Sequence, residues 1–193
     1  MKVRLVAPPW GTPKVTKELE EAVKILGDDV WSDSSLRFYA ERDAKIRTGK
    51  RAPKGMQATL NEVIADKLFA KGWEGDLGYY FKERTWVRVT FRHQMSLGSD
   101  IIDAIKVCKK EGMELAVIMA ANRETLNTIS PNDAGALTSF EKLQSEIWSL
   151  DGAIDIPLLI GELSPLTAPS QVISDELQKS RPRDRTVPAE RKG

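Results

Sequence analysis

One short segment, residues 85–94, carries the side chains best suited to chemistry, Arg88, Thr90 and Arg92. It is rich in Val, Thr, Trp and Phe, which favour a pleated strand. Side chains alternate along a strand, so if the valines and the phenylalanine face the core, Arg88, Thr90 and Arg92 share the other face. Guanidinium groups on such a face attract phosphate through charge-assisted hydrogen bonds. The segment closes on His93, within a cluster of hydrogen-bonding side chains.

His93 is the only histidine, which excludes a histidine metal cluster within one chain. A general base and a polar strand-end or phosphate contact are the two uses considered, and the second is favoured. Cys108 is the only cysteine, so no disulfide framework forms within the chain. Its surroundings predict a small side chain packed in an amphipathic helix, and a lone thiol fits a reducing cytosol.

A second candidate for phosphate contact is a basic stretch over residues 37–54. It holds seven Lys or Arg residues against two acids, Glu41 and Asp43. The basic residues are Arg37, Arg42, Lys45, Arg47, Lys50, Arg51 and Lys54. Two interpretations stay open: a solvated loop or helix face, and an arm that contacts phosphates.

Composition bounds the class of protein. The 193 residues are enough for one domain with a single core, and 41% hydrophobic with 30% charged residues is ordinary for a globular protein. The net charge of +1 gives no global nucleic-acid signal, so any DNA-binding face must come from local clustering. No apolar run approaches the roughly 20 residues that span a bilayer. The short apolar start does not resemble a signal peptide, and we expect a cytoplasmic protein without membrane contact.

The elements that would position these residues follow from periodicity and turn signals. Helices are expected over 17–26, capped by Thr16, and over 60–71, capped by Thr59. From residue 79 onward the order is strand, strand, helix, strand, helix, strand, and the two last strands are continuous apolar runs typical of burial on both faces. These six elements are expected near 79–81, 85–92, 101–110, 115–120, 138–150 and 156–161. The remaining segments are expected to be less regular (28–54), a turn (73–78), a polar loop (122–135) and a flexible polar tail (164–193). The sequence therefore predicts a single α/β domain over 1–163.

Four ordered segments resemble BglII/BstYI-type restriction endonucleases, a family with the PD-(D/E)XK nuclease fold. Residues 54–74 resemble the helix that follows its N-terminal region, and 87–91 (Val-Arg-Val-Thr-Phe) resembles its catalytic strand, Val/Ile-Glu-Val-Gln-Phe. Residues 138–141 resemble its Ser-Tyr-Tyr-Glu helix start, and 156–161 resemble its C-terminal strand. The resemblance covers about residues 54–163. It implies a central mixed sheet flanked by helices, a homodimer on duplex DNA, and Mg2+-dependent phosphodiester cleavage.

The catalytic positions that the resemblance implies are not acidic in this chain. The family's Glu falls on Arg88, its Gln on Thr90, and its preceding Asp on about Tyr79. Arginine cannot ligate a cation and stays positive at any relevant pH. A displaced site built from Glu62, Asp76 and Glu83 is the alternative, with Asp76 and Glu83 as the metal ligands. Whether the chain is an enzyme therefore stays open.

The leading hypothesis is a nuclease-fold protein that binds double-stranded DNA without cleaving it. It would act as a DNA-binding or assembly subunit of a restriction–modification system, as a homodimer or beside a nuclease or related subunit. The loop 122–135 corresponds to the family's base-reading region, since Asn and Arg suit adenine and guanine edges. The expected DNA contacts are Lys54, Arg84, Arg88, Arg92, His93, Asn122, Arg123 and Asn132. No cofactor is expected for this hypothesis, whereas an active restriction endonuclease with a displaced site would need Mg2+. The third possibility is a protein-interaction module that does not bind DNA.

Overall fold

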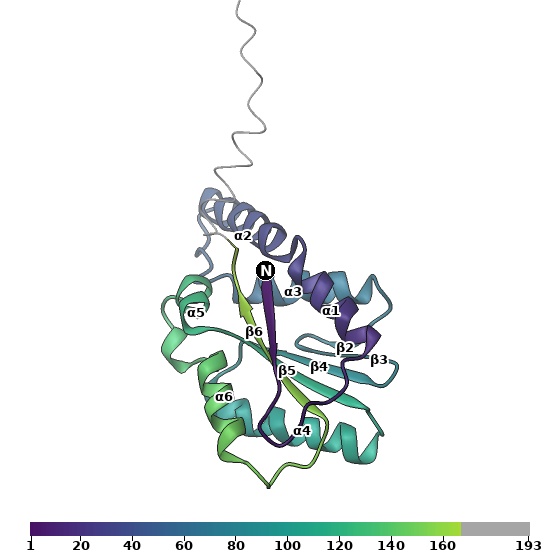
Figure 1. Ribbon diagram of the computed structural model, residues 1–193. Coiled ribbons are helices and arrows are strands. Elements are labelled where there is room, and N and C mark those ends of the chain that lie inside the picture. Colours follow the sequence, from purple (N-terminus) through teal and green to yellow (C-terminus); the bar gives the residue numbers. More distant parts are fainter. Residues whose placement is uncertain (167–193) are drawn as a thin grey trace, which may run out of the picture.

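A six-stranded mixed sheet forms the centre of the molecule (Figure 1), and the computed structural model describes residues 1–166. The strand order is β1-β6-β5-β4-β3-β2, and β4, β5 and β6 run parallel while the other neighbours are antiparallel. The strands are β1 (Lys2–Val6), β2 (Glu74–Asp76), β3 (Tyr79–Lys82), β4 (Thr85–Thr90), β5 (Leu115–Ala121) and β6 (Leu158–Ser164). The prediction of a central mixed sheet flanked by helices is confirmed.

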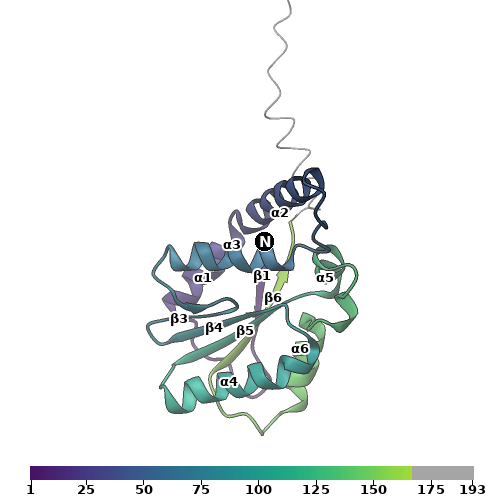
Figure 2. The same cartoon turned by 180° about the vertical axis from the view of Figure 1, so that it is seen from behind.

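Helices cover both faces of this sheet, as Figures 1 and 2 show. One core cluster joins the sheet to the apolar sides of α1 (Lys17–Gly27), α2 (Val30–Arg47), α3 (Gln57–Phe69) and α5 (Arg123–Ile129). A second cluster lies on the other face, under α4 (Leu97–Lys110) and α6 (Phe140–Ser149). Within residues 1–166, every helix is too short or too polar to span a bilayer.

Strand β4 lies inside the sheet, and all six of its residues are buried. Val87 and Val89 pack in the cluster under α1–α3, whereas Trp86 packs in the cluster under α4 and α6. Arg88 and Thr90 share the face of Trp86, because side chains alternate along the strand. The predicted alternation is correct, but the polar face is covered by α4 rather than open to solvent.

Several predicted boundaries are wrong, each for a local reason. The segment expected to be irregular contains α2, whose second half is solvent-exposed and so lacks an apolar period. Helix α3 begins at Gln57, so Thr59 lies inside the helix and does not cap it. The expected loop 122–135 contains α5, capped by the Asn122 side chain, and the expected turn 73–78 contains the short edge strand β2. Ser164 ends β6, and the predicted tail from residue 167 onward lies outside the described residues.

Candidate functional site

The three positions that the resemblance aligned with catalytic residues do gather on one face of the sheet. Tyr79 on β3 lies directly opposite Arg88 on β4 in the antiparallel register, and Thr90 follows two residues along. Tyr79 and Arg88 line one cavity of about 290 Å³ between the β3–β4 hairpin and α4. Thr90 is 1% exposed. The three positions therefore do lie together. They carry the phenol of Tyr79, the guanidinium of Arg88 and the hydroxyl of Thr90, where the resemblance implies an Asp, a Glu and a Gln.

Arg88 is neutralised by an aspartate that reaches it from α4. Its Nε lies 2.9 Å from Oδ1 of Asp100, whose side chain is completely buried. Arg92 approaches the same oxygen, with Nη1 at 3.2 Å, while half of its own side chain stays exposed. Oδ2 of Asp100 has no hydrogen-bond partner among the described residues. One buried carboxylate thus holds two arginines. The DNA contact predicted for Arg88 does not fit its burial at 9% exposure, and of the two arginines only Arg92 reaches solvent.

These residues do not fit a magnesium ion. A hard cation needs several oxygen ligands, and the one carboxylate at this place is already engaged by two guanidinium groups. Within residues 1–166, no group of three or more His, Cys, Asp or Glu side chains is arranged to hold a metal. We therefore assign no metal-dependent step to this face.

The acids proposed for a displaced site lie apart. Glu62 is on α3, where its carboxylate pairs with Arg37 of α2 at 2.6 Å. Asp76 ends β2 and accepts a hydrogen bond from the Leu77 amide at the β2–β3 turn. Glu83 is at the other end of β3, on the β3–β4 turn, with a positive φ of 50°. The structure does not assemble these three carboxylates into one site.

Three of the predicted DNA contacts are engaged in holding the fold. Arg84 lies at the start of β4, away from Arg92, and donates to the Gly112 carbonyl from Nε and Nη2. Asn122 caps α5 by accepting from the Thr125 amide, and its amide nitrogen donates to Glu162. The Arg123 guanidinium donates to the Ala134 carbonyl. These bonds give each of the three side chains a role in the fold, while the DNA contacts predicted for them stay predictions.

The other predicted contacts lie exposed around the ends of the parallel strands. His93 forms an isolated bridge with Leu137, directly after Arg92. Lys54 lines a hollow of about 230 Å³ that Thr128 and Pro131 also line, and Asn132 follows Pro131. Two hydrogen bonds join these segments. The Gln57 side-chain Nε2 donates to the Phe91 carbonyl, and the Met56 backbone amide donates to the Ile129 carbonyl. Lys54, Arg92, His93 and Asn132 therefore belong to neighbouring exposed segments.

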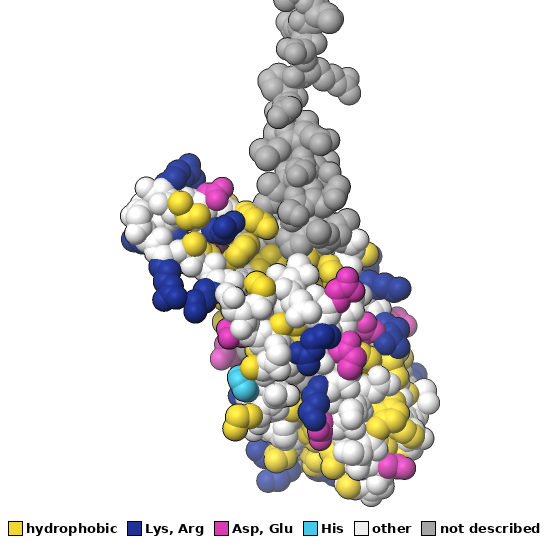
Figure 3. Space-filling model, turned by 90° about the vertical axis from the view of Figure 1, so that its left-hand side faces the viewer, with side chains coloured by type: hydrophobic (Ala, Val, Ile, Leu, Met, Phe, Trp, Pro, Cys, Tyr) yellow, Lys and Arg dark blue, Asp and Glu magenta, His cyan; other side chains and the backbone are white. Residues whose placement is uncertain are grey.

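The densest positive charge is on the second half of α2 and the loop that follows it. Six basic side chains are exposed there, and none forms an ion pair with a described residue. They form what we call the basic α2 surface: Arg42, Lys45, Arg47, Lys50, Arg51 and Lys54. Figure 3 shows Lys and Arg side chains gathered on the projecting end of the molecule. The charge excess of residues 37–54 predicted this surface from the sequence. It did not reveal that a helix carries the first half of the surface.

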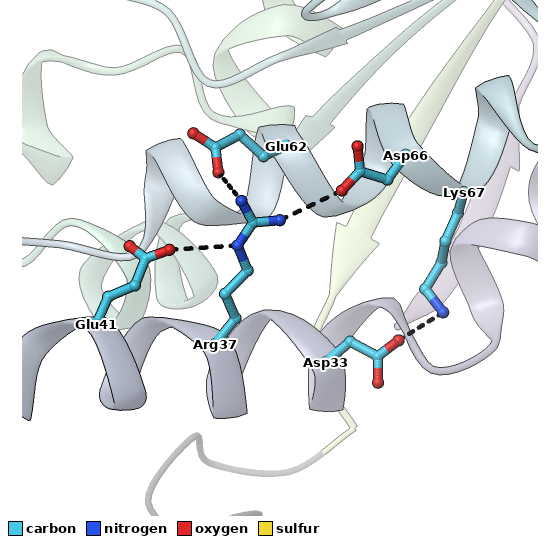
Figure 4. A network of polar contacts seen from close by, with 6 residues as sticks. All are labelled: Asp33, Arg37, Glu41, Glu62, Asp66 and Lys67. Atoms are coloured by element: carbon cyan, nitrogen blue, oxygen red, sulfur yellow. Dashed lines mark hydrogen bonds and ion pairs between the residues drawn. The ribbon is translucent and has the colours of Figure 1, made fainter. Parts of the chain in front are cut away.

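A network of ion pairs fastens α2 to α3 at the base of this surface (Figure 4). Arg37 contacts Glu41 at 3.2 Å, Glu62 at 2.6 Å and Asp66 at 3.2 Å. One turn earlier on α2, Asp33 pairs with Lys67 at 2.6 Å. Arg37 belongs to the basic stretch in sequence, but its guanidinium is paired with three carboxylates. The network holds the helix that presents the unpaired cations.

The hollow beside the basic α2 surface combines cations with an aromatic ring. Tyr39 and Arg42 line it, and the Arg42 guanidinium lies 6.0 Å from the centre of the Tyr39 ring. Gly55 also lines it, and a Cβ at this position would lie 2.5 Å from the Ile129 carbonyl oxygen. The close approach of these two backbone segments requires glycine and fixes the loop that carries Lys54.

Comparison with known proteins finds similarity in solved structures. The restriction endonuclease BglII complexed with a DNA 16-mer is 21% identical, with a TM-score of 0.44 over 53% of this chain and 52% of that chain. Free BglII is 17% identical, with a TM-score of 0.48 over 86% of this chain and 80% of that chain. The match to the DNA complex thus spans about half of that protein's length. No protein-family model and no curated protein matches.

Proposed function

We propose that this chain binds duplex DNA through the basic α2 surface and does not cleave it. The observation that carries the proposal is six exposed Lys and Arg side chains on one helix end and its loop, without ion-pair partners among the described residues. Only one acid, Asp43, lies among them in the sequence. Unpaired cations gathered on a projecting surface are what binding to a phosphate backbone requires, even when the whole protein is nearly neutral.

The proposal assigns backbone contacts rather than base reading. Lysine and arginine contacts to phosphate fix a protein on the duplex without selecting a sequence. The residues expected to read bases, Asn122 and Arg123, are engaged in capping and loop bonds. Arg92, His93 and Asn132 are exposed on segments that neighbour the loop of Lys54, and they would add polar contacts to the phosphate backbone. We therefore expect affinity that depends strongly on salt and weakly on sequence.

The absence of cleavage is part of the proposal and rests on the residues at the sheet face. Tyr79, Arg88 and Thr90 offer no carboxylate there, and Asp100 is held by two arginines. Hydrolysis of a phosphodiester by this fold needs a cation to activate water and to neutralise the developing charge. Incubation of plasmid with Mg2+ or Mn2+ should leave it intact, whereas cleavage abolished by Asp76→Ala or Glu83→Ala would establish the active-nuclease alternative.

The direct test is fluorescence anisotropy with several labelled duplexes of unrelated sequence. If all six cations contact phosphates, the slope of log K against log salt concentration should be roughly −5. The triple reversal Lys45→Glu, Arg47→Glu and Lys50→Glu should abolish measurable binding. A matched control reverses three exposed lysines on other helices, Lys24→Glu, Lys109→Glu and Lys110→Glu, and should retain most of the affinity. Equal losses of DNA affinity in both triple variants would show that binding depends on the net charge of the protein and not on the basic α2 surface.

The role within an assembly is tested in the same preparation. We propose a DNA-binding or assembly subunit, either as a homodimer or beside a nuclease subunit. Light scattering with and without a duplex gives the mass of the free protein and of the complex. No affinity for any duplex at low salt, with a co-purified partner and no nucleic acid present, would instead establish a protein-interaction module.

A further inference from the structure

A cavity of about 290 Å³ lies between the β3–β4 hairpin and α4, on the opposite face of the sheet from the basic α2 surface. Tyr79 and Phe81 of β3 and Trp86 of β4 supply aromatic walls, and Val107 and Met113 close the apolar side. This volume is just below the usual range of small-molecule sites, roughly 300 to 1,000 Å³, which suits one ring with a short substituent. The proposed DNA binding makes no use of the cavity.

Arg88 is the charged group inside this cavity, and it is 8% exposed. Its Nε lies near Asp100 Oδ1, but the N–H does not point along a hydrogen bond, and Nε has no hydrogen-bond partner among residues 1–166. A guanidinium carries five N–H donors in a planar fork. Buried donors without acceptors are costly, and native proteins satisfy them with protein groups, water or a ligand. The Arg88 guanidinium can therefore donate hydrogen bonds to an oxyanion that enters from the cavity.

The charges around the fork leave a positive excess for such an anion. Asp100 is the only carboxylate in contact with Arg88 and Arg92 among the described residues, so two guanidinium groups share one negative charge. Asp103 and Lys106 line the cavity from α4 and pair with each other at 3.4 Å, so they contribute little net charge. Glu111 adds a negative charge to the lining, but it lies at the C-cap of α4, whereas Asp100 lies in the first turn of that helix, so the excess of cations is confined to the fork itself. A carboxylate or phosphate oxygen at Arg88 would complete the neutralisation, and an attached ring would lie against the aromatic walls.

We propose that this cavity binds a small aromatic oxyanion, a single ring bearing a carboxylate or a phosphate. The oxyanion accepts hydrogen bonds from the Arg88 guanidinium, and the ring packs between the hairpin aromatics and α4. The site stands independently of the proposed DNA function, because the two surfaces share no residue. Its ligand has one recognisable chemistry, which a free aromatic acid or an aromatic phosphate ester could equally supply.

Isothermal titration calorimetry on the full chain tests this with four probes of matched size. Phenylacetate and phenyl phosphate carry both the ring and the anion, benzyl alcohol lacks the charge, and inorganic phosphate lacks the ring. We expect one-to-one binding of one or both aromatic anions, with the comparison naming the preferred acid group. Benzyl alcohol and inorganic phosphate should bind at least about tenfold more weakly, because the first cannot pair with the Arg88 guanidinium as an anion and the second has no ring to pack against the aromatic walls.

Variants separate the two halves of the site. Tyr79 is 39% exposed, so the fold should tolerate Tyr79→Ser. This variant should weaken binding of the aromatic anion by roughly fivefold. The pair Arg88→Met with Asp100→Asn, which removes both charges together, should weaken it by roughly 10- to 100-fold. Val107→Phe should block entry, whereas Ile102→Phe on the exposed side of α4 should leave binding unchanged.

Three outcomes would overturn the proposal. The first is no binding of either aromatic anion up to about 10 mM, which would leave water as the partner of Arg88. The second is binding of inorganic phosphate as tight as that of phenyl phosphate, which would reduce the site to a cationic spot. The third is undiminished binding in both Tyr79→Ser and Val107→Phe, which would place the anion elsewhere. Anisotropy with duplex DNA is measured on each variant, so that loss of one function is seen apart from loss of the other.

Discussion

Arg88 of β4 and Asp100 of α4 form a buried ion pair, with Nε 2.9 Å from Oδ1 and the two side chains 9% and 0% exposed. The pair joins β4, the second strand of the β3–β4 hairpin, to α4. Burying two charges is costly, and their attraction offsets that cost only when both partners are present. Arg92 adds a second, half-exposed contact to the same oxygen. The pair therefore makes the polar face of β4 compatible with a helix packed over it.

Removing one partner of this pair should destabilise the fold strongly. Arg88→Met leaves Asp100 buried with only Arg92, and we expect a loss of roughly 3 kcal/mol in the free energy of unfolding. The double variant Arg88→Met with Asp100→Asn should recover most of that loss, because no uncompensated charge remains. Urea unfolding followed by circular dichroism gives both values. Equal losses in the single and double variants would show that the pair is not coupled.

The sequence predicts best those elements whose burial is continuous. Strand β5 is an uninterrupted apolar run, and the structure buries all seven of its residues. Thr16 was correctly predicted to cap α1, because a hydroxyl immediately before an amphipathic run is a local signal. Helix α2 was missed because it buries small serines, Ser34 and Ser35, beside a few large side chains, and its second half faces solvent. A helix whose length exceeds its buried portion gives no apolar period to detect.

The site was harder to predict than the fold, because its contacts are not local. The sequence identified Arg88 as the informative residue of β4, and the structure adds that Tyr79 lies opposite it in the register. It gave no sign that Asp100, twelve positions later, turns back to neutralise that arginine. Likewise, Asn122 and Arg123 looked like free polar residues in a loop, and only the fold shows that they cap α5 and hold the Ala134 carbonyl. Residue type indicated which side chains could bind a ligand. Packing decided which of them are already bonded within the fold.

Cys108 should be an unreactive thiol in the folded protein. Burial raises its pKa from 9.0 to about 11, with Lys109 opposing the shift only partly. At pH 8 the thiolate fraction should be roughly a hundredfold lower than in the unfolded chain, and iodoacetamide labelling should be slower in proportion. Labelling of native protein at the rate seen in urea would contradict the burial of this thiol.

The same shift predicts how Cys108 affects stability as pH changes. The folded state holds the thiol proton more tightly than the unfolded state, so the contribution is full below pH 9 and is lost as the pH rises toward 11. The difference in unfolding free energy between the parent chain and Cys108→Ala should therefore shrink over that interval. A difference that grows with pH would mean that the thiolate is the favoured form in the fold.

Thr16 should contribute more than an ordinary helix cap. Its hydroxyl oxygen accepts from the Leu19 amide at 3.1 Å and lies 2.7 Å from the hydroxyl of Thr85, which is fully buried at the start of β4. Thr16→Ala removes the cap and leaves the Thr85 hydroxyl without this partner, so we expect a loss of roughly 2 kcal/mol. Thr16→Ser keeps the oxygen and should cost much less. Urea unfolding separates the two, and similar losses would assign the effect to the missing methyl group.

The ion-pair network of Arg37 should control the basic α2 surface more than it controls global stability. The Arg37 side chain is 42% exposed, and exposed ion pairs contribute little to stability, so breaking these pairs should cost under about 2 kcal/mol of unfolding free energy. The expected local effect is faster amide hydrogen exchange over residues 38–47, because α2 is then less firmly held on α3. Mass spectrometry of exchange in Arg37→Met measures this directly.

The effect of the network on DNA affinity distinguishes positioning from simple electrostatics. Glu62→Gln with Asp66→Asn breaks the two contacts of Arg37 that reach α3, leaves the contact with Glu41, and makes the protein more positive near the basic α2 surface. If charge alone governed binding, this double variant would bind duplex DNA more tightly than the parent chain. If the network positions the cations, affinity should instead fall by roughly two- to fivefold, together with faster exchange in α2. Anisotropy at a fixed low salt concentration decides between the two, and tighter binding would remove any positioning role for Arg37.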